Sequence, residues 1–359
     1  MKGMIFNMNK LKVGVIFGGM STEHDVSISS GTSIIKNLSK EKYEILPIYI
    51  SQEGKWFKYK KNIEEIEALH VGDKITEIEK IENEFEYLKG LDIAFPVLHG
   101  LYGEDGTIQG LLELLNVKYV GCKVLSSSIC MDKVYAKIIF EKAKIPQAKY
   151  VYVKAEEGEY TYVCENFEEE KLTLKTIAQK TEKKLGFPVF VKPSNSGSSV
   201  GIKKANSISE LKKAIEYASK YDTKILIEEE IIGREIECAV LGNSDVKATC
   251  VGEILPAEDF YTFDAKYKNA ESRVVIPAEI EEEKQEEIKK IAIKAFKAVD
   301  GKGLARVDFF IRKSDNKVYI NEINTLPGFT QISMYPKLWE QCGIEYTKLL
   351  DELIKLAQN

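Results

Sequence analysis

The stretch ARVDFFIRKSDNKVYINEINTLPG, residues 305–328, decides the fold. It predicts two short strands, 305–311 and 317–323, joined by a hairpin. Side chains two apart on a strand share a face, so Arg306 and Asp308 point the same way. Glu322 and Asn324 do the same on the second strand, and the hairpin brings the two pairs together. Two carboxylates and an amide are hard oxygen ligands, which suit Mg²⁺ or Mn²⁺. A cross-strand salt bridge between Arg306 and one acid explains the pattern equally well.

Lysines and a loop of small residues offer a site for phosphate. Lys192 ends the apolar run FPVFV, so it lies near the interior of a sheet and needs an anion there. The stretch PSNSGSSVG that follows can donate backbone N–H groups and serine hydroxyls. Lys133 and Lys266 are also candidates, although a single lysine is more often at the surface. Cations opposite a metal would clamp a nucleoside triphosphate, the arrangement that phosphoryl transfer requires.

The chain of 359 residues exceeds what one core organises, so we expect several domains. In residues 1–121, strands at 12–17, 43–50, 92–98 and 117–120 alternate with helices, which predicts a doubly wound, mostly parallel sheet. Glu23 and His99 would lie at the carboxyl ends of its strands, where ligands collect. The rest of the chain mixes helices with antiparallel strands, and 156–183 is polar and weakly patterned. The fold class is α/β with α+β parts.

Composition excludes several classes of protein. Hydrophobic residues at 44% and charged residues at 30% are typical of a soluble enzyme, and a formal charge of −5 gives no general attraction to nucleic acid or anionic membranes. The six cysteines include no C-x-x-C pair, which favours reduced thiols in the cytosol. The first residues do not fit a signal peptide, and no window is apolar enough to span a bilayer. We therefore expect a cytoplasmic protein without nucleic-acid or membrane partners.

Seven stretches, in this order, resemble the D-alanine–D-alanine ligase family of the ATP-grasp superfamily. They are GGMSTEHDVSISSG, VLHGLYGEDGTIQG, MDK, VKPSNSGSSVG, FYTFDAKY, GLARVDFF and NEINTLPGFTQISMYP. The resemblance covers essentially the full length. It implies a pre-ATP-grasp domain (1–121), then a two-part ATP-grasp fold (122–225 and 226–359) with a mobile lid loop at about 258–275. It also implies ligation of two D-alanines through a D-alanyl phosphate, for peptidoglycan precursor synthesis, and a homodimer.

The resemblance implies a nucleotide site as well. Lys133 and Lys192 would contact the α- and β-phosphates, and Lys266 would reach the γ-phosphate. The loop 194–200, with Ser198 and Ser199, would close over the triphosphate. Glu228 and Glu229 would contact the adenine, and Glu235 would contact the ribose. The ligands of two Mg²⁺ (or Mn²⁺) ions would be Asp308, Glu322 and Asn324.

For the amino acids, the resemblance assigns Glu23 to the first ammonium group, with His99 nearby. Arg306 and the Gly328 N–H would stabilise the tetrahedral oxyanion. The other assignments are a hydrogen-bonded set of Glu23, Ser198 and Tyr267, and a second-substrate site of Tyr261, Ser333 and Met334. Simpler roles exist for four of these residues: a helix-dipole acid for Glu23, a turn serine for Ser198, a hydrogen-bonded strand-end histidine for His99 and a cap for Ser333.

Two residues bear on which second substrate is used. Relatives that make D-alanyl-D-lactate carry histidine where Tyr267 stands, and relatives that make D-alanyl-D-serine tend to carry arginine where Met334 stands. Met334 has no donor for a hydroxyl group. The pattern therefore favours D-alanine over D-serine or D-lactate. Another ATP-grasp carboxylate–amine ligase, or a nucleotide-binding protein without catalysis, remains an alternative.

Overall fold

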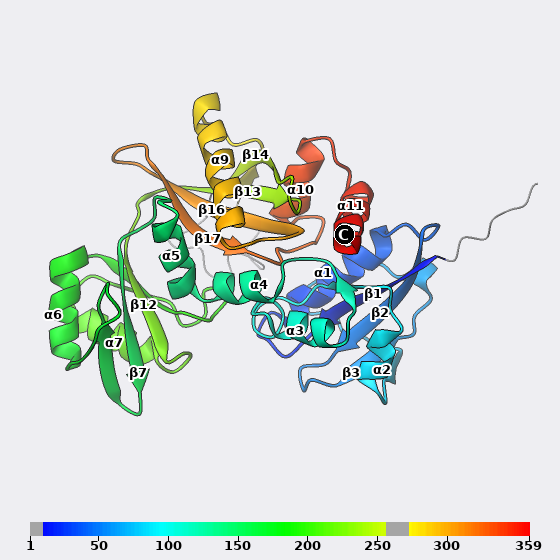
Figure 1. Ribbon diagram of the computed structural model, residues 1–359, viewed down its shortest axis with the longest axis horizontal. Helices are drawn as coiled ribbons and strands as arrows, with labels where there is room; N and C mark the ends of the chain where they lie inside the picture. The colour runs from blue at the N-terminus through cyan, green and yellow to red at the C-terminus, as the bar shows by residue number, and fades with distance from the viewer. Residues whose placement is uncertain (1–9, 256–272) are drawn as a thin grey trace, which may run out of the picture. The chain divides into compact units, whose positions relative to one another are not determined.

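The computed structural model describes residues 10–255 and 273–359. Tyr261, Lys266 and Tyr267, with most of the predicted lid loop, lie outside the described residues. The chain divides into two compact units (Figure 1). The first comprises Met1–Gly103, Thr107–Gly121 and Gly328–Asn359, and the second comprises Glu104–Gly106 and Cys122–Pro327. The C-terminal residues 328–359 therefore group with the first unit, and the further division at residue 225 stays a prediction.

The first unit is built on a six-stranded sheet in the order β4-β3-β2-β1-β5-β6. The central pairings are parallel and the β2–β3 and β3–β4 pairings are antiparallel, so the predicted doubly wound sheet is confirmed with an antiparallel edge. Gly31 lets a helix approach this sheet closely, because a Cβ there would lie 2.4 Å from the Cβ of Phe17. The strands are β1 (Leu11–Gly18), β2 (Tyr43–Ile50), β3 (Trp56–Tyr59), β4 (Ile78–Lys80), β5 (Ile93–Pro96) and β6 (Lys118–Tyr119). The helices are α1 (His24–Asn37), η1 (Ile63–Glu65), α2 (Glu84–Lys89), α3 (Thr107–Leu114), α10 (Met334–Gln341) and α11 (Tyr346–Gln358).

The second unit contains an antiparallel sheet in the order β11-β10-β12-β7-β8-β9. Alternation along its strands sends Val191 and Ile227 into a core shared with α6 and α7, and sends Lys192 and Glu228 to the opposite face. The polar segment 156–183 supplies β8, β9 and α6, so it extends and covers this sheet. The strands are β7 (Tyr150–Glu156), β8 (Glu159–Val163), β9 (Glu169–Lys171), β10 (Val189–Pro193), β11 (Lys203–Ala205) and β12 (Lys224–Glu229). The helices are α6 (Leu174–Leu185) and α7 (Ile208–Ala218).

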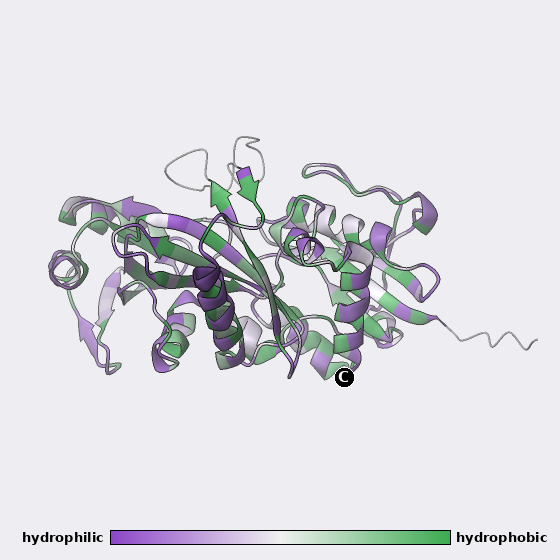
Figure 2. Cartoon of the chain, turned by 90° about the horizontal axis from the view of Figure 1, so that it is seen from above, coloured by the Kyte–Doolittle hydropathy of each residue, from purple (hydrophilic) through white to green (hydrophobic). Residues whose placement is uncertain are grey.

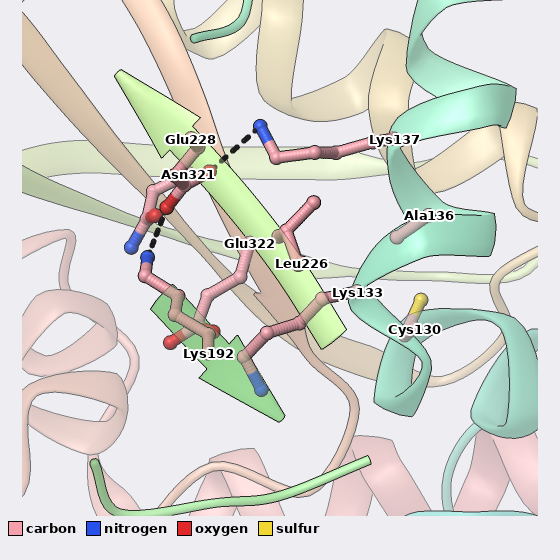
Figure 3. A pocket seen from close by; sticks show the side chains of 9 residues that line it. All are labelled: Cys130, Lys133, Ala136, Lys137, Lys192, Leu226, Glu228, Asn321 and Glu322. Carbon is pink, nitrogen blue, oxygen red and sulfur yellow. Dashed lines mark ion pairs between the residues drawn. The ribbon is translucent and has the colours of Figure 1, made fainter. Parts of the chain in front are cut away.

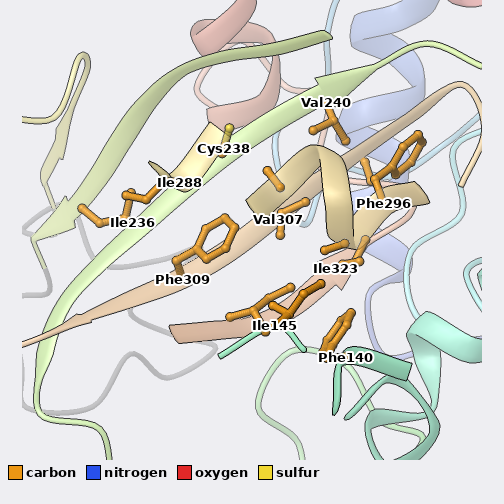
Figure 4. Packing of buried hydrophobic residues seen from close by; sticks show 14 of the residues in the cluster. Phe140, Ile145, Ile236, Cys238, Val240, Ile288, Phe296, Val307, Phe309 and Ile323 are labelled. Atoms are coloured by element: carbon orange, nitrogen blue, oxygen red, sulfur yellow. The ribbon is translucent and has the colours of Figure 1, made fainter. Parts of the chain in front are cut away.

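A second antiparallel sheet of this unit has the order β15-β14-β13-β16-β17. Its apolar face packs on α9 and α5 around Phe140, Phe296 and Phe309 (Figure 4). In Figure 2, hydrophobic residues concentrate in the strands, while the helices alternate between hydrophobic and hydrophilic positions. The strands are β13 (Gly233–Leu241), β14 (Lys247–Leu255), β15 (Arg273–Val275), β16 (Leu304–Arg312) and β17 (Val318–Asn324). The helices are α4 (Val124–Met131), α5 (Lys133–Lys142) and α9 (Glu282–Ala298).

All six cysteines are free; Cys122, Cys130 and Cys238 are buried, whereas Cys342 is exposed. Among the described residues, no helix combines the length and apolarity that crossing a membrane demands.

Candidate functional site

The polar face of the β16–β17 hairpin brings four predicted site residues together. Their register pairs Arg306 with Asn324 and Asp308 with Glu322, and an irregularity in the pairing follows Asp308. The Asn324 amide donates from Nδ2 to Oδ2 of Asp308 over 2.9 Å. The two-residue spacing read from the sequence therefore places all four side chains on one face, as predicted.

Arg306 is the electrostatic centre of this face. Its Nε and Nη2 donate to the two carboxylate oxygens of Asp308, each over 2.8 Å. Nε also lies 2.9 Å from Oε2 of Glu237, which projects from the neighbouring strand β13. Burial lowers the pKa of Arg306, but the charges of Asp308 and Glu237 outweigh it and raise the pKa well above its ordinary value. The salt bridge considered from the sequence is thus present, within β16 and across to β13 rather than across the hairpin.

The donor set on this hairpin fits a hard divalent cation. Asp308 and Glu322 are directly paired across two strands, and the Asn324 Nδ2 faces Asp308, which leaves the amide oxygen for another partner. No group of three or more His, Cys, Asp or Glu side chains within residues 10–255 and 273–359 is arranged to hold a metal. A metal here would therefore depend on two carboxylates, the amide and oxygen atoms of a ligand.

A pocket in the second unit lies between α5, β10, β12 and β17. Glu228 forms ion pairs with two lysines of this pocket: its Oε2 lies 3.0 Å from Nζ of Lys137, and its Oε1 pairs with Lys192 (Figure 3). Burial raises the pKa of Glu228, but the two lysine charges outweigh it and lower the pKa to about 2. Burial lowers the pKa of Lys192, yet Glu228 raises it above the ordinary value. The pocket lining is Cys130, Lys133, Ala136, Lys137, Lys192, Leu226, Glu228, Asn321 and Glu322.

The anion that Lys192 requires is thus supplied by the protein itself. Lys192 and Glu228 share a face of the sheet because Lys192 pairs with Leu226, two residues before Glu228. The lysine nevertheless lines a pocket that also contains Lys133 and Glu322. The structure therefore brings the two predicted phosphate-binding lysines together with one predicted metal ligand.

The loop of small residues is tied to the start of α5. Lys133 donates from its backbone N–H to Ser194 O over 3.1 Å, and its ammonium donates to Ser196 O. Asp132 caps α5 and accepts hydrogen bonds from Ser194 Oγ and Lys224 Nζ, each over 2.6 Å. These contacts fix where the loop leaves β10 relative to Lys133.

Within this loop, Ser198 and Ser199 have φ values of 50° and 60°, in the left-handed region. That conformation costs of order 1–3 kcal/mol at each non-glycine residue. Such strain is typical of loops that bind ligands, and it also fits the simpler role of Ser198 as a turn residue.

The other predicted nucleotide contacts lie on β12 and β13. Glu229 follows Glu228, and its Oε1 accepts a hydrogen bond from the Lys149 N–H over 2.8 Å. Glu235 lies on β13, paired with Ile254 and Phe310 on the flanking strands. Their proposed adenine and ribose contacts stay predictions.

In the first unit, Glu23 and His99 are neighbours, and both are buried. Ser21 links them: its Oγ donates to His99 O over 2.6 Å and accepts from the Glu23 N–H over 3.1 Å. A Cβ on Gly100 would lie 2.7 Å from Oε2 of Glu23, so glycine leaves room for the carboxylate. His99 Nε2 also lies 3.0 Å from Ser30 Oγ. Glu23 occupies the cap position of α1, but its side chain makes no capping hydrogen bond there.

The segment after Pro327 places three more predicted residues in the first unit. Ser333 Oγ accepts from the Thr330 N–H over 3.0 Å, and a Cβ on Gly328 would lie 2.9 Å from it. Ser333 precedes α10 without a side-chain cap, and Met334, the first residue of that helix, is buried. Gly328 and Ser333 are therefore held together by a tight turn.

Sequence reasoning missed three charged residues that organise these groups: Asp132, Lys137 and Glu237. Lys137 follows Lys133 by four residues, which puts both on one face of α5. That spacing is a signal for Lys137, but lysines at this spacing are common on exposed helix faces. Asp132 stands in the MDK motif but was not singled out there. Nothing in the sequence marked Glu237 as a partner of Arg306.

The fold and the grouped lysines and carboxylates define an α/β protein of the ATP-grasp class, and the predicted fold class is confirmed. Two family models match the chain, described as D-ala D-ala ligase N-terminus over residues 12–122 and D-ala D-ala ligase C-terminus over residues 139–355. The chain belongs to the D-alanine–D-alanine ligase family.

Individual relatives agree with this assignment. The chain is 52% identical to D-alanine–D-alanine ligase B of Clostridium tetani, covering 100% of this chain and 96% of the relative. It is 49% identical to the ligase of Acetivibrio thermocellus, over 97% of this chain and 96% of the relative. Among solved structures, the D-alanine–D-alanine ligase from Coxiella burnetii has a TM-score of 0.80 at 36% identity, covering 97% of this chain and 94% of that one. The VanG D-Ala:D-Ser ligase from Enterococcus faecalis has a TM-score of 0.82 at 35% identity, covering 97% and 99%.

Proposed function

We propose that the protein joins two D-alanines to D-alanyl-D-alanine at the expense of ATP, through a D-alanyl phosphate. Relatives at about 50% identity over nearly the whole chain support the reaction, and a role in peptidoglycan precursor synthesis follows from the family. The single observation that carries the chemistry is the pocket that gathers Lys133, Lys192 and Glu322. Cations and a carboxylate around one space are what a triphosphate and its counter-ion need.

The nucleotide half of the reaction would use the second unit. Lys133 and Lys192 would neutralise phosphate oxygens, and the loop 194–200 would cover them. Asp308, Glu322 and Asn324 would hold Mg²⁺ or Mn²⁺, which when bound would neutralise charge on the β- and γ-phosphates. Glu228, Glu229 and Glu235 are the proposed base and ribose contacts, and Lys266 is the proposed γ-phosphate contact.

In the amino-acid half of the reaction, phosphorylation would convert the carboxylate oxygen of the first D-alanine, a poor leaving group, into phosphate, a good one. A D-alanine carboxylate attacks the γ-phosphorus, which releases ADP and gives an acyl phosphate. The amine of the second D-alanine then attacks that carbonyl, and inorganic phosphate leaves. Glu23 would bind the first ammonium, Arg306 and the Gly328 N–H would bind the oxyanion, and Ser333 with the Met334 N–H would bind the second carboxylate. We also keep His99 near the first ammonium and Tyr261 in the site of the second substrate. The proposal further includes hydrogen bonds that join Glu23, Ser198 and Tyr267.

The test is phosphate release from ATP and Mg²⁺ with D-alanine, compared with L-alanine, and with mixtures of D-alanine and D-serine or D-lactate. D-alanine alone should support turnover, and its product should be the D,D-dipeptide by mass spectrometry. Equal rates with L-alanine would refute the proposed amino-acid pocket. Turnover only with an unrelated carboxylate and amine would indicate a different ATP-grasp ligase.

D-serine is the second candidate for the accepting amino acid, because the solved D-Ala:D-Ser ligase resembles this chain as closely as the solved D-Ala–D-Ala ligase does. Met334 argues against D-serine, because a buried thioether at the start of α10 offers no hydrogen-bond donor to a serine hydroxyl. We further propose a cytoplasmic location, where ATP is supplied, and a homodimer, which the molar mass by light scattering would check.

A further inference from the structure

Lys137 is a buried lysine that the proposed reaction does not use. It lies one turn beyond Lys133 on α5, and only 3% of its surface is exposed. Its ammonium lies 3.0 Å from Oε2 of Glu228, donates to Ala148 O over 3.3 Å, and stands 5.4 Å from the centre of the Tyr150 ring. A buried charge is stable only with such partners, so Lys137 is held firmly against β12 and the start of β7.

Glu228 divides its two oxygens between Lys137 and Lys192 (Figure 3). The two lysines approach from different elements, α5 and β10, and Glu228 is itself buried. Two ammonium groups and one carboxylate carry a net charge of +1. Without Lys137, Glu228 and Lys192 would form a neutral pair with little attraction for an anion.

The partner of Lys192 matters when a phosphate arrives. If its ammonium turns toward the phosphate, Glu228 loses one of its two cations. A buried carboxylate left with no cation is strongly destabilising, by several kcal/mol in typical proteins. Lys137 stays bound to Glu228 and removes that cost.

We propose that Lys137 is a positioning residue for nucleotide binding: by holding and compensating Glu228, it frees Lys192 to engage a phosphate. This inference rests on the proposed function, because it takes Lys192 as a phosphate ligand. Lys137 itself acts through Glu228 and does not touch the nucleotide.

The experiment is calorimetric binding of ADP with Mg²⁺ to the full-length protein and to variants. Lys137→Met should bind ADP about tenfold more weakly, by analogy with the roughly 10–100-fold effect of losing a residue that orients a metal ligand. Lys142→Met is the matched control, since Lys142 is exposed on the same helix, and its affinity should stay within about twofold of the parent. Lys137→Arg keeps the positive charge and should recover most of the affinity. In steady state, the KM for ATP should rise in Lys137→Met while the KM for D-alanine stays unchanged, which a general loss of structure would not produce.

A double variant decides whether Lys137 acts through Glu228. Glutamine at position 228 carries no charge, so releasing Lys192 from it leaves no buried carboxylate. Lys137→Met combined with Glu228→Gln should therefore bind ADP no more weakly than Glu228→Gln alone, and this comparison stands even if Lys137→Met by itself does not fold. Losses that add, or a Lys137→Met affinity equal to that of Lys142→Met, would overturn the inference. Failure of the unaltered protein to bind ADP would overturn the proposed function instead.

Discussion

Replacing Arg306 by lysine tests whether one buried guanidinium holds the polar face of the β16–β17 hairpin together. Arg306 makes two hydrogen bonds of 2.8 Å to Asp308 and lies 2.9 Å from Glu237. Lysine keeps the charge but has a single nitrogen, which cannot reproduce the planar fork. At least one hydrogen bond to a charged group is lost, and such bonds contribute roughly 1.5–3 kcal/mol. We expect the free energy of unfolding to fall by about 2 kcal/mol.

Urea unfolding followed by far-UV circular dichroism measures this loss as a lower midpoint with an unchanged slope. Arg312→Lys is the control: Arg312 ends the same strand and makes the same two-nitrogen pairing with Asp315, but near the surface. Exposed pairs contribute little, so its midpoint should move much less. Equal shifts in the two variants would refute the reasoning.

Turnover provides a second readout of Arg306→Lys. If Arg306 donates to the oxyanion, its loss should lower kcat by about 10²-fold, the typical effect of removing one such donor. Native turnover in a folded Arg306→Lys protein would remove Arg306 from the proposed chemistry and leave it a structural role.

Three further predictions concern Gly100, Glu228 and Lys266. Gly100→Ala places a Cβ 2.7 Å from the Glu23 carboxylate at a φ of +73°. The KM for D-alanine should therefore rise by about tenfold or more, while the affinity for ADP is kept. An unchanged KM would contradict the proposed role of Glu23. The pKa of Glu228 is lowered from 4.5 to about 2, so its charge contributes fully to stability above pH 4.5, and this contribution is lost as the pH falls toward 2. The free energy of unfolding of Glu228→Gln, measured against pH, should lack this part of the decline. Lys266→Ala should lower kcat far more than ADP affinity, as measured by steady-state kinetics and calorimetry, and equal losses would speak against a γ-phosphate contact.

Much of the fold could be predicted because it is encoded locally. The predicted strands 12–17 and 43–50 appear as β1 and β2. The residues Ser207-Ile208-Ser209-Glu210 have the pattern of a capping box. The Ser207 side chain accepts from the Glu210 N–H over 3.3 Å, while the Glu210 carboxylate accepts from the Asn206 N–H rather than from that of Ser207. Periodicity and caps depend on neighbours in the chain, which the sequence displays directly.

Other elements escaped prediction because their stability depends on distant partners. The short strands β8 and β9 lie in the polar segment 156–183, where no clear alternation marks them, and they form by extending the sheet from β7. Helix α10 contains Pro336, which reads as a helix breaker, yet it lies in the first turn, where no N–H donor is needed.

The sequence by itself determined the polar face of the hairpin, since two-residue spacing and a short turn place Arg306 and Asp308 opposite Asn324 and Glu322 whatever surrounds them. It also determined the family, through motifs that stand in order along the chain. Only the tertiary structure decided which charges meet. Lys137 is one lysine among many until α5 packs on β12, and that packing buries it against Glu228, because the partners of a buried charge are chosen by the contacts between elements far apart in the sequence.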